Sequence, residues 1–526
     1  MKLLIVESPA KAKTIKGFLD DSFDVVSSIG HFRDLPEKGI GIEEDENFTV
    51  KEWVIDRKKA DPLINGIKKS KEIFLALDPD REGELIAWHV VELCKEKKLV
   101  ENRTFRRIEF SAIRKNDILE SISNPREINQ NLVNAAITRR FLDKFFGYKI
   151  SPITTRRTIF GKSAGRVQSP TLKIICAREK EIDLFIPQEF WEVNIELKDE
   201  NGNAIKGNLY SESKIKIEKL SVKNEQQAKN LKANLLKSIF KIEEVIKREK
   251  RRSPYSPFSN SLLLQDASSK LGFSPKYTNS LAQELKDGIS DLGALITYHR
   301  SDSNRMKQNE TNNLRKIIIK EIGDNYLSPN EISYKEKSKF VQQGHEAVTP
   351  TQLDRRPESV KDKLNNDQYK LYELIWKRTI ASQMAQSRNM ETTYLIKGGN
   401  FVIKSSGSIQ VFDGFKKIYN YSEKSDEEQT LPDLKKNQEL QISNVEIKQN
   451  FTKPPNRYSE AGLIKKLEEL GIGRPSTYVS IFTKLESNSY ISIKNKSLIP
   501  TSRGKVLSKF LDGFFFKFVD YQFTAD

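Results

Sequence analysis

The feature that most constrains the fold is an alternation of short apolar runs and amphipathic segments over roughly the first 120 residues. Strand–helix alternation of this kind is typical of a mainly parallel sheet with helices on both faces. In such sheets, ligands bind beyond the carboxyl ends of the strands. The pattern predicts strands at 3–6, 23–29, 72–77 and 107–110 and helices at 8–19 and 82–97.

The rest of the chain changes character several times. Residues 128–184 are helical in pattern and rich in Arg and Lys, whereas 187–252 alternate as strands and end in the basic stretch KREKRR. Residues 258–388 are mostly helical, strand patterning returns near 392–406 and 440–447, and helices follow from 459. Insertion of a helical domain into a β-rich one would produce this order. The acidic segment 425–432 is expected to be a surface loop.

The bulk charge points to a polyanionic partner without proving one. The formal net charge is +17 and the pI is about 9.4. Neutralising phosphates with Lys and Arg releases counterions, but a Lys-rich proteome would give the same surplus. The two cysteines, Cys94 and Cys176, support neither a disulfide framework nor a Cys-based zinc site. This cysteine usage fits a reducing, cytoplasmic setting. No signal peptide and no membrane-spanning stretch is expected.

Acidic residues follow two of the predicted strands. Glu7 follows the strand at 3–6, and the strand at 72–77 runs into Asp78, Asp80 and Glu82. On extended backbone a spacing of two places side chains on one face, so the three acids are expected to converge on a magnesium ion beside a phosphate. Glu7 would then be a separate carboxylate, as a general acid or base requires. Alternatively, Asp80 is only a helix cap.

A tyrosine in the segment GALITYHRSDSNRM (293–306) is a candidate nucleophile. A free phenol, with a pKa near 10, is a weak nucleophile at neutral pH and needs a cation or a base. Arg300 could stabilise both a phenolate at Tyr298 and a phosphate. Without context, ITY is usually a strand tyrosine, and in a strand His299 would point the other way. Lys11, in the helix after Glu7, could supply a further positive charge.

The segment KSAGRVQSPTLKII (162–175) predicts a glycine-containing loop that enters a helix. Ser163 is a plausible cap, and backbone N–H groups of the loop could bind phosphate. An ordinary capped helix start would give the same pattern. Arg139, Arg140 and Asp143 would pass as a solvated helix face, and a lone histidine such as His345 is usually structural.

Several of these segments together resemble one family. LIVESPAKAKTI and LALDPDREGELIAWH, with SIGHFRDLP between them, resemble the toprim domain of type IA DNA topoisomerases. ITYHRSDS resembles the active-site signature of that family, in which the tyrosine attacks the DNA backbone and stays bound to the 5′ phosphate. His299 and Ser301 stand where the family more often has Met and Thr, and Thr349 replaces the common Arg of the HEAxxPT segment. RYSEAGLIKKLEELGIGRPSTYVSI (457–481) matches a late segment of the core.

The resemblance runs from residue 2 to the last residue, and bacterial topoisomerase I is the closest subtype. It implies a multidomain α/β and α+β fold, in which a Rossmann-like toprim domain, helical domains and a β-rich hinge domain form a toroid. The ending FVDYQFTAD resembles the middle of the final core helical region, so the chain is expected to stop early and to lack a zinc-ribbon tail. The expected domains are toprim (1–127), helical DNA-groove (128–186 and 452–526), β-rich hinge (187–256 and 389–451) and tyrosine-bearing helical (257–388).

The resemblance also implies an activity and its residues. The expected reaction is transient single-strand cleavage through a 5′-phosphotyrosyl link, strand passage and religation, which relaxes negatively supercoiled DNA without ATP. Tyr298 would attack, Arg300 and Lys11 would stabilise charge, and Glu7 would act as general acid and then base, with Mg²⁺ on Asp78, Asp80 and Glu82. The expected DNA contacts are His31, Arg81, Arg139, Arg140, Asp143, Gly165, Arg166, Gln168, His345 and Arg474.

A bacterial monomer associated with the nucleoid is expected, acting on single-stranded segments, with no zinc and no membrane. Two alternatives stay open at this point. One is a toprim nuclease that cuts without resealing, and the other is an inactive DNA-binding paralogue.

Overall fold

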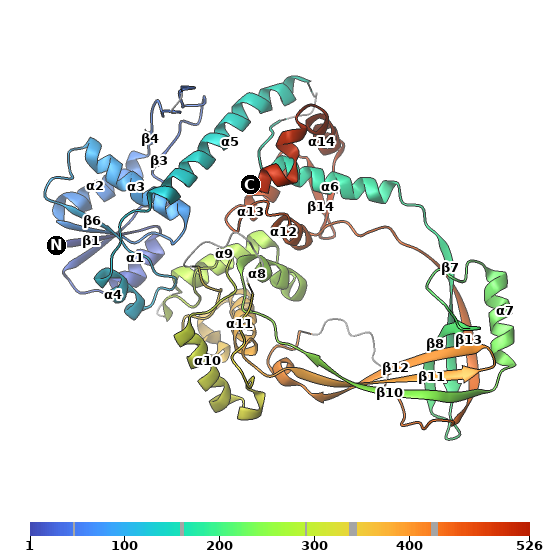
Figure 1. The fold of residues 1–526 in the computed structure, drawn as a ribbon. Coiled ribbons are helices and arrows are strands. Elements are labelled where there is room, and N and C mark those ends of the chain that lie inside the picture. The colour runs from blue at the N-terminus through green and yellow to red at the C-terminus, as the bar shows by residue number, and fades with distance from the viewer. Residues whose placement is uncertain (46–47, 158–161, 290–291, 336–344, 422–429, 526) are drawn as a thin grey trace.

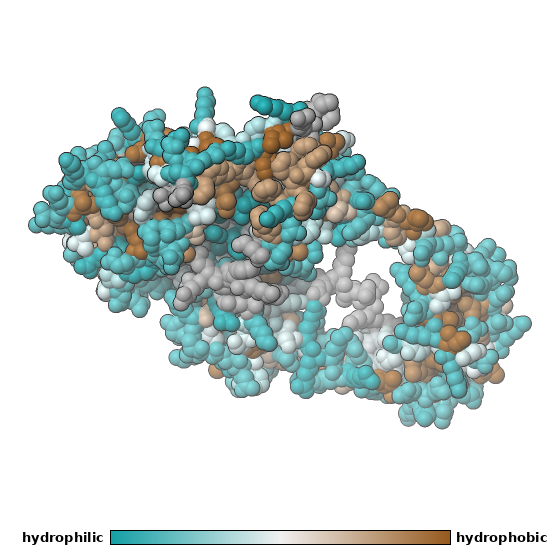
Figure 2. All heavy atoms as spheres, turned by 45° about the horizontal axis from the view of Figure 1, so that its top comes forward, coloured by the Kyte–Doolittle hydropathy of each residue, from teal (hydrophilic) through white to brown (hydrophobic). Residues whose placement is uncertain are grey.

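The computed structural model describes residues 1–45, 48–157, 162–289, 292–335, 345–421 and 430–525. The chain forms a ring, in which a β-rich part lies across an opening from the helical parts (Figure 1). The space-filling view shows the same opening and a mostly hydrophilic surface around it (Figure 2). The predicted toroid of α/β, helical and β-rich parts is therefore confirmed.

The N-terminal region (residues 1–127) contains the predicted parallel sheet. Its strand order is β2-β1-β5-β6 over the described residues, and every pairing is parallel. The strand predicted at 107–110 is wrong in position, because β6 ends at Arg107. The elements are β1 (Lys2–Val6), α1 (Pro9–Lys16), β2 (Phe23–Ser27), β3 (Arg33–Asp34), β4 (Val54–Ile55), α2 (Arg57–Lys69), β5 (Glu72–Leu75), α3 (Arg81–Glu96), β6 (Thr104–Arg107) and α4 (Lys115–Ser123).

Burial on both faces explains why the central strand reads as one apolar run. Leu3 and Ile5 pack in one core with residues of α2 and α3. Leu4 and Val6 pack in a second core with residues of α1 and α4. Successive strand residues point to opposite faces, so a strand covered on both sides must be apolar throughout. β1 and β5 run parallel side by side, and the segments that follow them, with Glu7 and Asp78, leave the same edge.

The groove region (128–186 and 452–526) joins segments that are far apart in sequence. One hydrophobic core contains Phe146 and Leu172 together with Ile472 and Leu507. A hairpin interrupts the helical pattern that the sequence predicted after residue 459. The elements are α5 (Gln130–Arg157), α6 (Gln168–Asp183), α12 (Glu460–Glu469), α13 (Tyr478–Ser487), β14 (Ile491–Lys494), β15 (Ser497–Pro500), α14 (Ser502–Phe514), a 3-10 turn (Phe516–Val519) and α15 (Tyr521–Ala525).

The β-rich region (187–256 and 389–451) is a second sheet with the order β12-β11-β10-β13-β7-β8-β9 among the described strands. An additional antiparallel pairing of β12 with β8 closes it. The basic stretch KREKRR is the end of β10, and most of the loop predicted at 425–432 lies outside the described residues. The elements are β7 (Glu189–Lys198), β8 (Ala204–Glu212), β9 (Ile215–Lys216), α7 (Glu225–Leu236), β10 (Phe240–Arg252), β11 (Ser387–Gly398), β12 (Phe401–Phe412), a 3-10 turn (Gly414–Lys417) and β13 (Glu439–Phe451).

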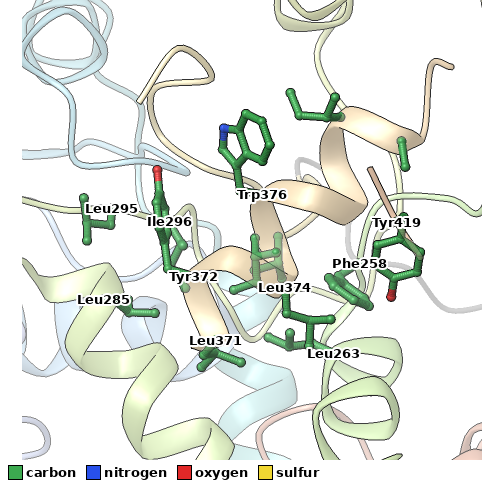
Figure 3. Close-up of a cluster of buried hydrophobic side chains, with 14 of the residues drawn as sticks. Phe258, Leu263, Leu285, Leu295, Ile296, Leu371, Tyr372, Leu374, Trp376 and Tyr419 are labelled. Atoms are coloured by element: carbon green, nitrogen blue, oxygen red, sulfur yellow. The ribbon is translucent and has the colours of Figure 1, made fainter. Parts of the chain in front are cut away.

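The lid region (257–388) packs around helix α11, whose Leu371 and Leu374 meet Leu285 and Leu295 in one core (Figure 3). Tyr419 also packs there, although it falls in the predicted hinge segment, and the domain boundaries stay predictions. The elements are α8 (Asn260–Asp266), a π-helical turn (Ala267–Leu271), α9 (Pro275–Asp287), α10 (Gln308–Glu321), 3-10 turns (Asp324–Tyr326 and Pro357–Lys363) and α11 (Asn366–Ala381).

Candidate active site

The acidic loop after β5 turns directly into a helix. Asp80 is the N-cap of α3, and its carboxylate accepts a hydrogen bond from the Gly83 amide at 2.8 Å. Glu82 therefore lies in the first helical turn and not on extended backbone, so the predicted one-face arrangement of the three acids is wrong. Within the described ranges, no group of three or more His, Cys, Asp or Glu side chains could hold a metal ion.

Asp78 lies in a buried cluster of charges. Lys11 of α1 forms a very short ion pair with it, and Lys286 of α9 lies 3.3 and 3.1 Å from its two carboxylate oxygens. Burial alone would raise the pKa of Asp78, but Lys11 and Lys286 hold it well below the usual value. The lysine from the lid region thus reaches the acid loop of the N-terminal region.

Glu7 has the opposite electrostatic behaviour. Burial first, and then the negative charge of Asp78, raise the pKa of Glu7 to about 8. Glu7 is therefore mostly protonated at neutral pH and hydrogen-bonds to Asp78. Two neighbouring carboxyl groups with separated pKa values are the arrangement that lets one act as an acid while the other stays charged.

Tyr298 of the lid region faces the same loop. Its hydroxyl donates a hydrogen bond to Asp80 Oδ2 at 2.5 Å, and its amide donates to the Ser111 carbonyl at 2.8 Å. The context-free alternative, an ordinary strand tyrosine, does not hold, because Tyr298 lies in no strand and the nearby pairing of Ile296 with Pro350 is an isolated bridge. Tyr298 therefore contacts Asp80, which follows the third predicted strand of the sequence, and feels the charge of Asp78.

The surroundings of Tyr298 keep its phenol protonated. Burial, followed by the charges of Asp80 and Asp78, raises the pKa of Tyr298 well above its usual value, and Arg300 opposes this shift. Burial lowers the pKa of Arg300, but the charges of Tyr298, Asp78 and Asp80 raise it overall. The neighbouring His299 ring is fully buried without a hydrogen-bond partner in the described part of the chain. Burial, Lys286 and Arg300 push the pKa of His299 well below its usual value, so the ring is neutral.

His345 joins the lid region to the acidic loop. Its Nε2 lies 2.9 Å from the Pro79 carbonyl oxygen, and its Nδ1 lies 2.8 Å from Asp302 Oδ1. Burial lowers the pKa of His345, but the hydrogen bond and charge of Asp302 outweigh it and raise the pKa overall. Sequence reasoning placed this residue among the DNA contacts, whereas here both ring nitrogens have protein partners. Glu346 also connects the lid region to the N-terminal region, because it accepts a hydrogen bond from Ser111 Oγ at 2.8 Å.

Glu82 lies apart from Asp78, at the wall of a groove. It accepts from His31 at 3.0 Å and from Arg140 at 3.1 Å, and Arg139 lies 3.8 Å away. Burial raises its pKa, but the His31 hydrogen bond and the arginines lower it to about 2. The groove has a volume of about 870 Å³, and its lining includes Glu82, Arg139, Arg140, Asp143, Lys144, Tyr148, Lys162 and Ser163.

In the loop before α6, the amides of residues 162–165 already have hydrogen-bond partners. The amides of Lys162 and Ser163 both donate to the Tyr490 hydroxyl at 2.8 Å, Ala164 donates to Ser151 Oγ, and Gly165 donates to Ser169 Oγ. The predicted phosphate-binding amides are therefore already satisfied at 162–165. Ser163 is not the cap either, because Val167 is the N-cap of α6.

The remaining predicted contacts lie near the groove wall. Arg166 Nε is 3.5 Å from Asp143 Oδ1, and a Cβ at Gly165 would come within 2.7 Å of the Gln168 side chain. Arg474 donates to the Gly471 and Gly473 carbonyls. Burial lowers the pKa of Arg81, and the charges of Arg139 and Arg474 lower it further, so three arginines share one electrostatic environment.

Sequence reasoning missed three residues that organise the site. Lys286 lies in no recognised motif, and nothing in its spacing marks it. Arg107 is fully buried and donates to the carbonyls of Leu77 and Asp78, which fixes the acidic loop from below. Tyr490 organises the loop before α6 from a segment more than 300 residues away in sequence. For Arg107 the sequence carried no clear signal, because it ends a strand whose other residues are exposed or half-buried.

Comparison with known proteins identifies the relatives of this arrangement. Residues 2–113 match the toprim domain family, and residues 127–526 match the DNA topoisomerase family. DNA topoisomerase 1 of Rickettsia felis is 44% identical over 537 residues, covering 100% of this chain and 69% of that protein. DNA topoisomerase 1 of Campylobacter jejuni is 39% identical, covering 100% of this chain and 74% of that protein.

A solved structure agrees with these matches. The full-length topoisomerase I of Thermotoga maritima superposes with a TM-score of 0.85 at 34% sequence identity, covering 99% of this chain and 84% of that one. Within the described ranges, the helices are too short or too polar to cross a membrane.

Proposed function

The chain belongs to the DNA topoisomerase family and is a type IA enzyme, and from that premise we propose which of its residues carry each step. A type IA enzyme opens and reseals one DNA strand and so changes DNA topology. The nuclease and the inactive paralogue are not favoured. The observation that carries the assignment is the contact between the Tyr298 hydroxyl and Asp80, beside the cluster of Glu7 and Asp78.

Tyr298 is the proposed nucleophile. Its oxygen forms the bond to phosphorus while the bond from phosphorus to the 3′ oxygen breaks. Asp80, which accepts the hydrogen bond of the phenol, is the nearest described acceptor for the phenolic proton. Arg300 and Lys11 supply positive charge to the phosphate, which lowers the cost of developing negative charge in a partly buried site.

Glu7 is the proposed general acid. Its pKa of about 8 leaves it protonated at neutral pH, so it can donate a proton to the departing 3′ oxygen. The resulting 3′ hydroxyl can return the proton to Glu7 as it attacks the phosphotyrosine and reseals the strand. A pKa close to the working pH suits a group that must both give and take a proton.

Membership of the toprim and type IA families implies a divalent metal and no ATP. We keep Mg²⁺ as the ion and Asp78, Asp80 and Glu82 as its ligands. Their present arrangement does not fit the ion, however, because lysines, the phenol and the His31–Arg140 pair already occupy these carboxylates. We therefore assign none of the steps above to the metal.

DNA is the substrate, and we propose that a single-stranded segment lies in the groove beside α5. Arginine and lysine side chains there match phosphates, and Tyr148 offers an exposed ring for stacking. The β-rich region would act as the hinge of the ring, and a monomer in the bacterial cytoplasm, at the nucleoid, would suffice. The proposed DNA contacts are His31, Arg81, Arg139, Arg140, Asp143, Gly165, Arg166, Gln168, His345 and Arg474.

The test is relaxation of negatively supercoiled plasmid with Mg²⁺. Wild type should give a ladder of relaxed topoisomers and a covalent protein–DNA adduct under denaturing conditions, and Tyr298→Phe should give neither. Tyr277→Phe, a matched change at an exposed tyrosine of α9, should behave as wild type. Nicking by Tyr298→Phe would support the nuclease, and a wild type without an adduct would support the paralogue.

A further inference from the structure

Lys286 is a lid-region residue whose ammonium lies inside the acid cluster of the N-terminal region. Its Nζ is 3.3 and 3.1 Å from the Asp78 oxygens, and the residue is 4% exposed. The same ammonium lies 5.4 Å from the centroid of the Tyr298 ring. Lys286 thus contacts both Asp78 and the Tyr298 ring. It is not among the residues proposed above as metal ligand, general acid or nucleophile.

The end of α9 is held against the N-terminal region by its neighbours. Asp287 accepts a hydrogen bond from Ser8 Oγ at 3.0 Å, and its carbonyl accepts from Thr14 Oγ1 at 3.2 Å. On the other side, Leu285 is buried in the lid core (Figure 3). Adjacent helix residues point in directions about 100° apart, so fixing Leu285 in the core also fixes the direction of Lys286. Its contact with Asp78 is thus set by the packing of the lid.

The carboxylates of this cluster are already paired with ammonium groups. Lys11 and Lys286 both form ion pairs with Asp78, and Lys286 also pairs with Asp287. A divalent cation on Asp78 would add two positive charges beside two ammonium groups, which carry no lone pair to coordinate it. Lys11 belongs to the same region as Asp78, whereas Lys286 belongs to the lid region.

We propose that Lys286 is a lid-borne cation that competes with a divalent metal ion for Asp78, so that closure of the ring and metal occupancy of Asp78 oppose each other. The inference rests on the proposed role of Asp78 as a metal ligand. Coupling between two equilibria is reciprocal. If contact of the lid with Asp78 weakens metal binding by a given factor, metal binding must weaken that contact by the same factor. Lys286 is a positioning residue here and touches no reacting atom.

Magnesium binding to the full chain without DNA tests the competition directly. Isothermal titration calorimetry with Mg²⁺, at constant ionic strength, compares wild type with Lys286→Gln and with the charge-keeping Lys286→Arg. Lys276→Gln, at an exposed lysine of the same helix, removes the same charge away from the cluster. We expect Lys286→Gln to bind Mg²⁺ at least about 5-fold more tightly, the lower end of usual coupling factors. The other two variants should stay within about twofold of wild type.

Asp78→Asn separates the two possible failures. If Asp78→Asn binds Mg²⁺ as wild type does, the proposed metal ligand is wrong, whatever Lys286 does. If Asp78→Asn loses binding but Lys286→Gln binds no more tightly than Lys276→Gln, the competition is overturned and the metal assignment stands.

Hydrogen exchange in wild type gives a reciprocal measurement that does not depend on whether Lys286→Gln folds. Mg²⁺ should raise exchange in the last turns of α9, and unchanged exchange at saturating Mg²⁺ would also overturn the proposal.

Discussion

Glu84→Gln should destabilise the acidic loop through Arg107, which donates hydrogen bonds to the Leu77 and Asp78 carbonyls. Among the described residues, Glu84 is the only carboxylate within 3.0 Å of the Arg107 guanidinium. Both side chains are fully buried. The carboxylate also accepts from the two terminal nitrogens of Arg126 at 2.8 and 2.7 Å and from the Asn129 amide at 2.6 Å. Gln keeps the size of the side chain but leaves the buried Arg107 charge without this partner.

The expected cost follows from that geometry. Removing one partner of a buried ion pair costs about 3–5 kcal/mol, because the remaining charge stays in a poorly solvated site. Arg107 keeps its hydrogen bonds to backbone carbonyls, and Gln can still accept one hydrogen bond, so the lower end, about 3 kcal/mol, is expected. Each 1.36 kcal/mol is tenfold in an equilibrium constant, so opening of this region should become about a hundredfold more frequent.

Hydrogen exchange with mass spectrometry measures this opening region by region in the full chain. Peptides from β1, β5 and α3 should exchange about a hundredfold faster in Glu84→Gln, while peptides from the β-rich region stay unchanged. Glu92→Gln makes the same change on the surface of α3, where the ion pair with Lys95 is partly solvated and worth at most about 1 kcal/mol. A change below tenfold in Glu84→Gln, or one equal to that in Glu92→Gln, would refute the reasoning.

Two further predictions concern the groove region. Tyr490→Phe removes the acceptor of the Lys162 and Ser163 amides, so we expect a loss of about 1–3 kcal/mol in local stability and weaker binding of single-stranded DNA, measured by fluorescence anisotropy. The hydrogen bonds and charge of Arg457 lower the folded-state pKa of Glu179 below its unfolded value of about 4.5. The stabilisation is therefore present above the unfolded pKa and is lost as the pH falls through the lower folded-state pKa. The melting temperature of Glu179→Gln should approach that of wild type on acidification from pH 7 to about pH 3, and an unchanged gap would contradict the assignment.

The sequence alone determined the features that depend on neighbouring residues, such as strand burial and helix capping. The apolar runs of the first 120 residues predicted a parallel sheet, because strands buried on both faces have no polar positions. The acids after two parallel strands predicted that Glu7 and Asp78 would share an edge, and Asp80 was recognisable as a possible cap. Tyr298 was found through its resemblance to a known signature, since a tyrosine in an apolar segment carries little information by itself.

Tertiary structure decided how these parts meet. Asp78 and Lys286 are 208 residues apart, and Asp80 and Tyr298 are 218 apart. No periodicity spans such distances, so these contacts depend on how the lid packs against the N-terminal region. Packing also overrode one local argument, because Tyr490 satisfied amides that looked free for phosphate. The start of α3, which placed Glu82 in a helical turn, was by contrast a local effect of the Asp80 cap. Periodicity and capping act over a few residues, whereas the charge state and partners of a buried group are set by whatever the closed ring brings against it.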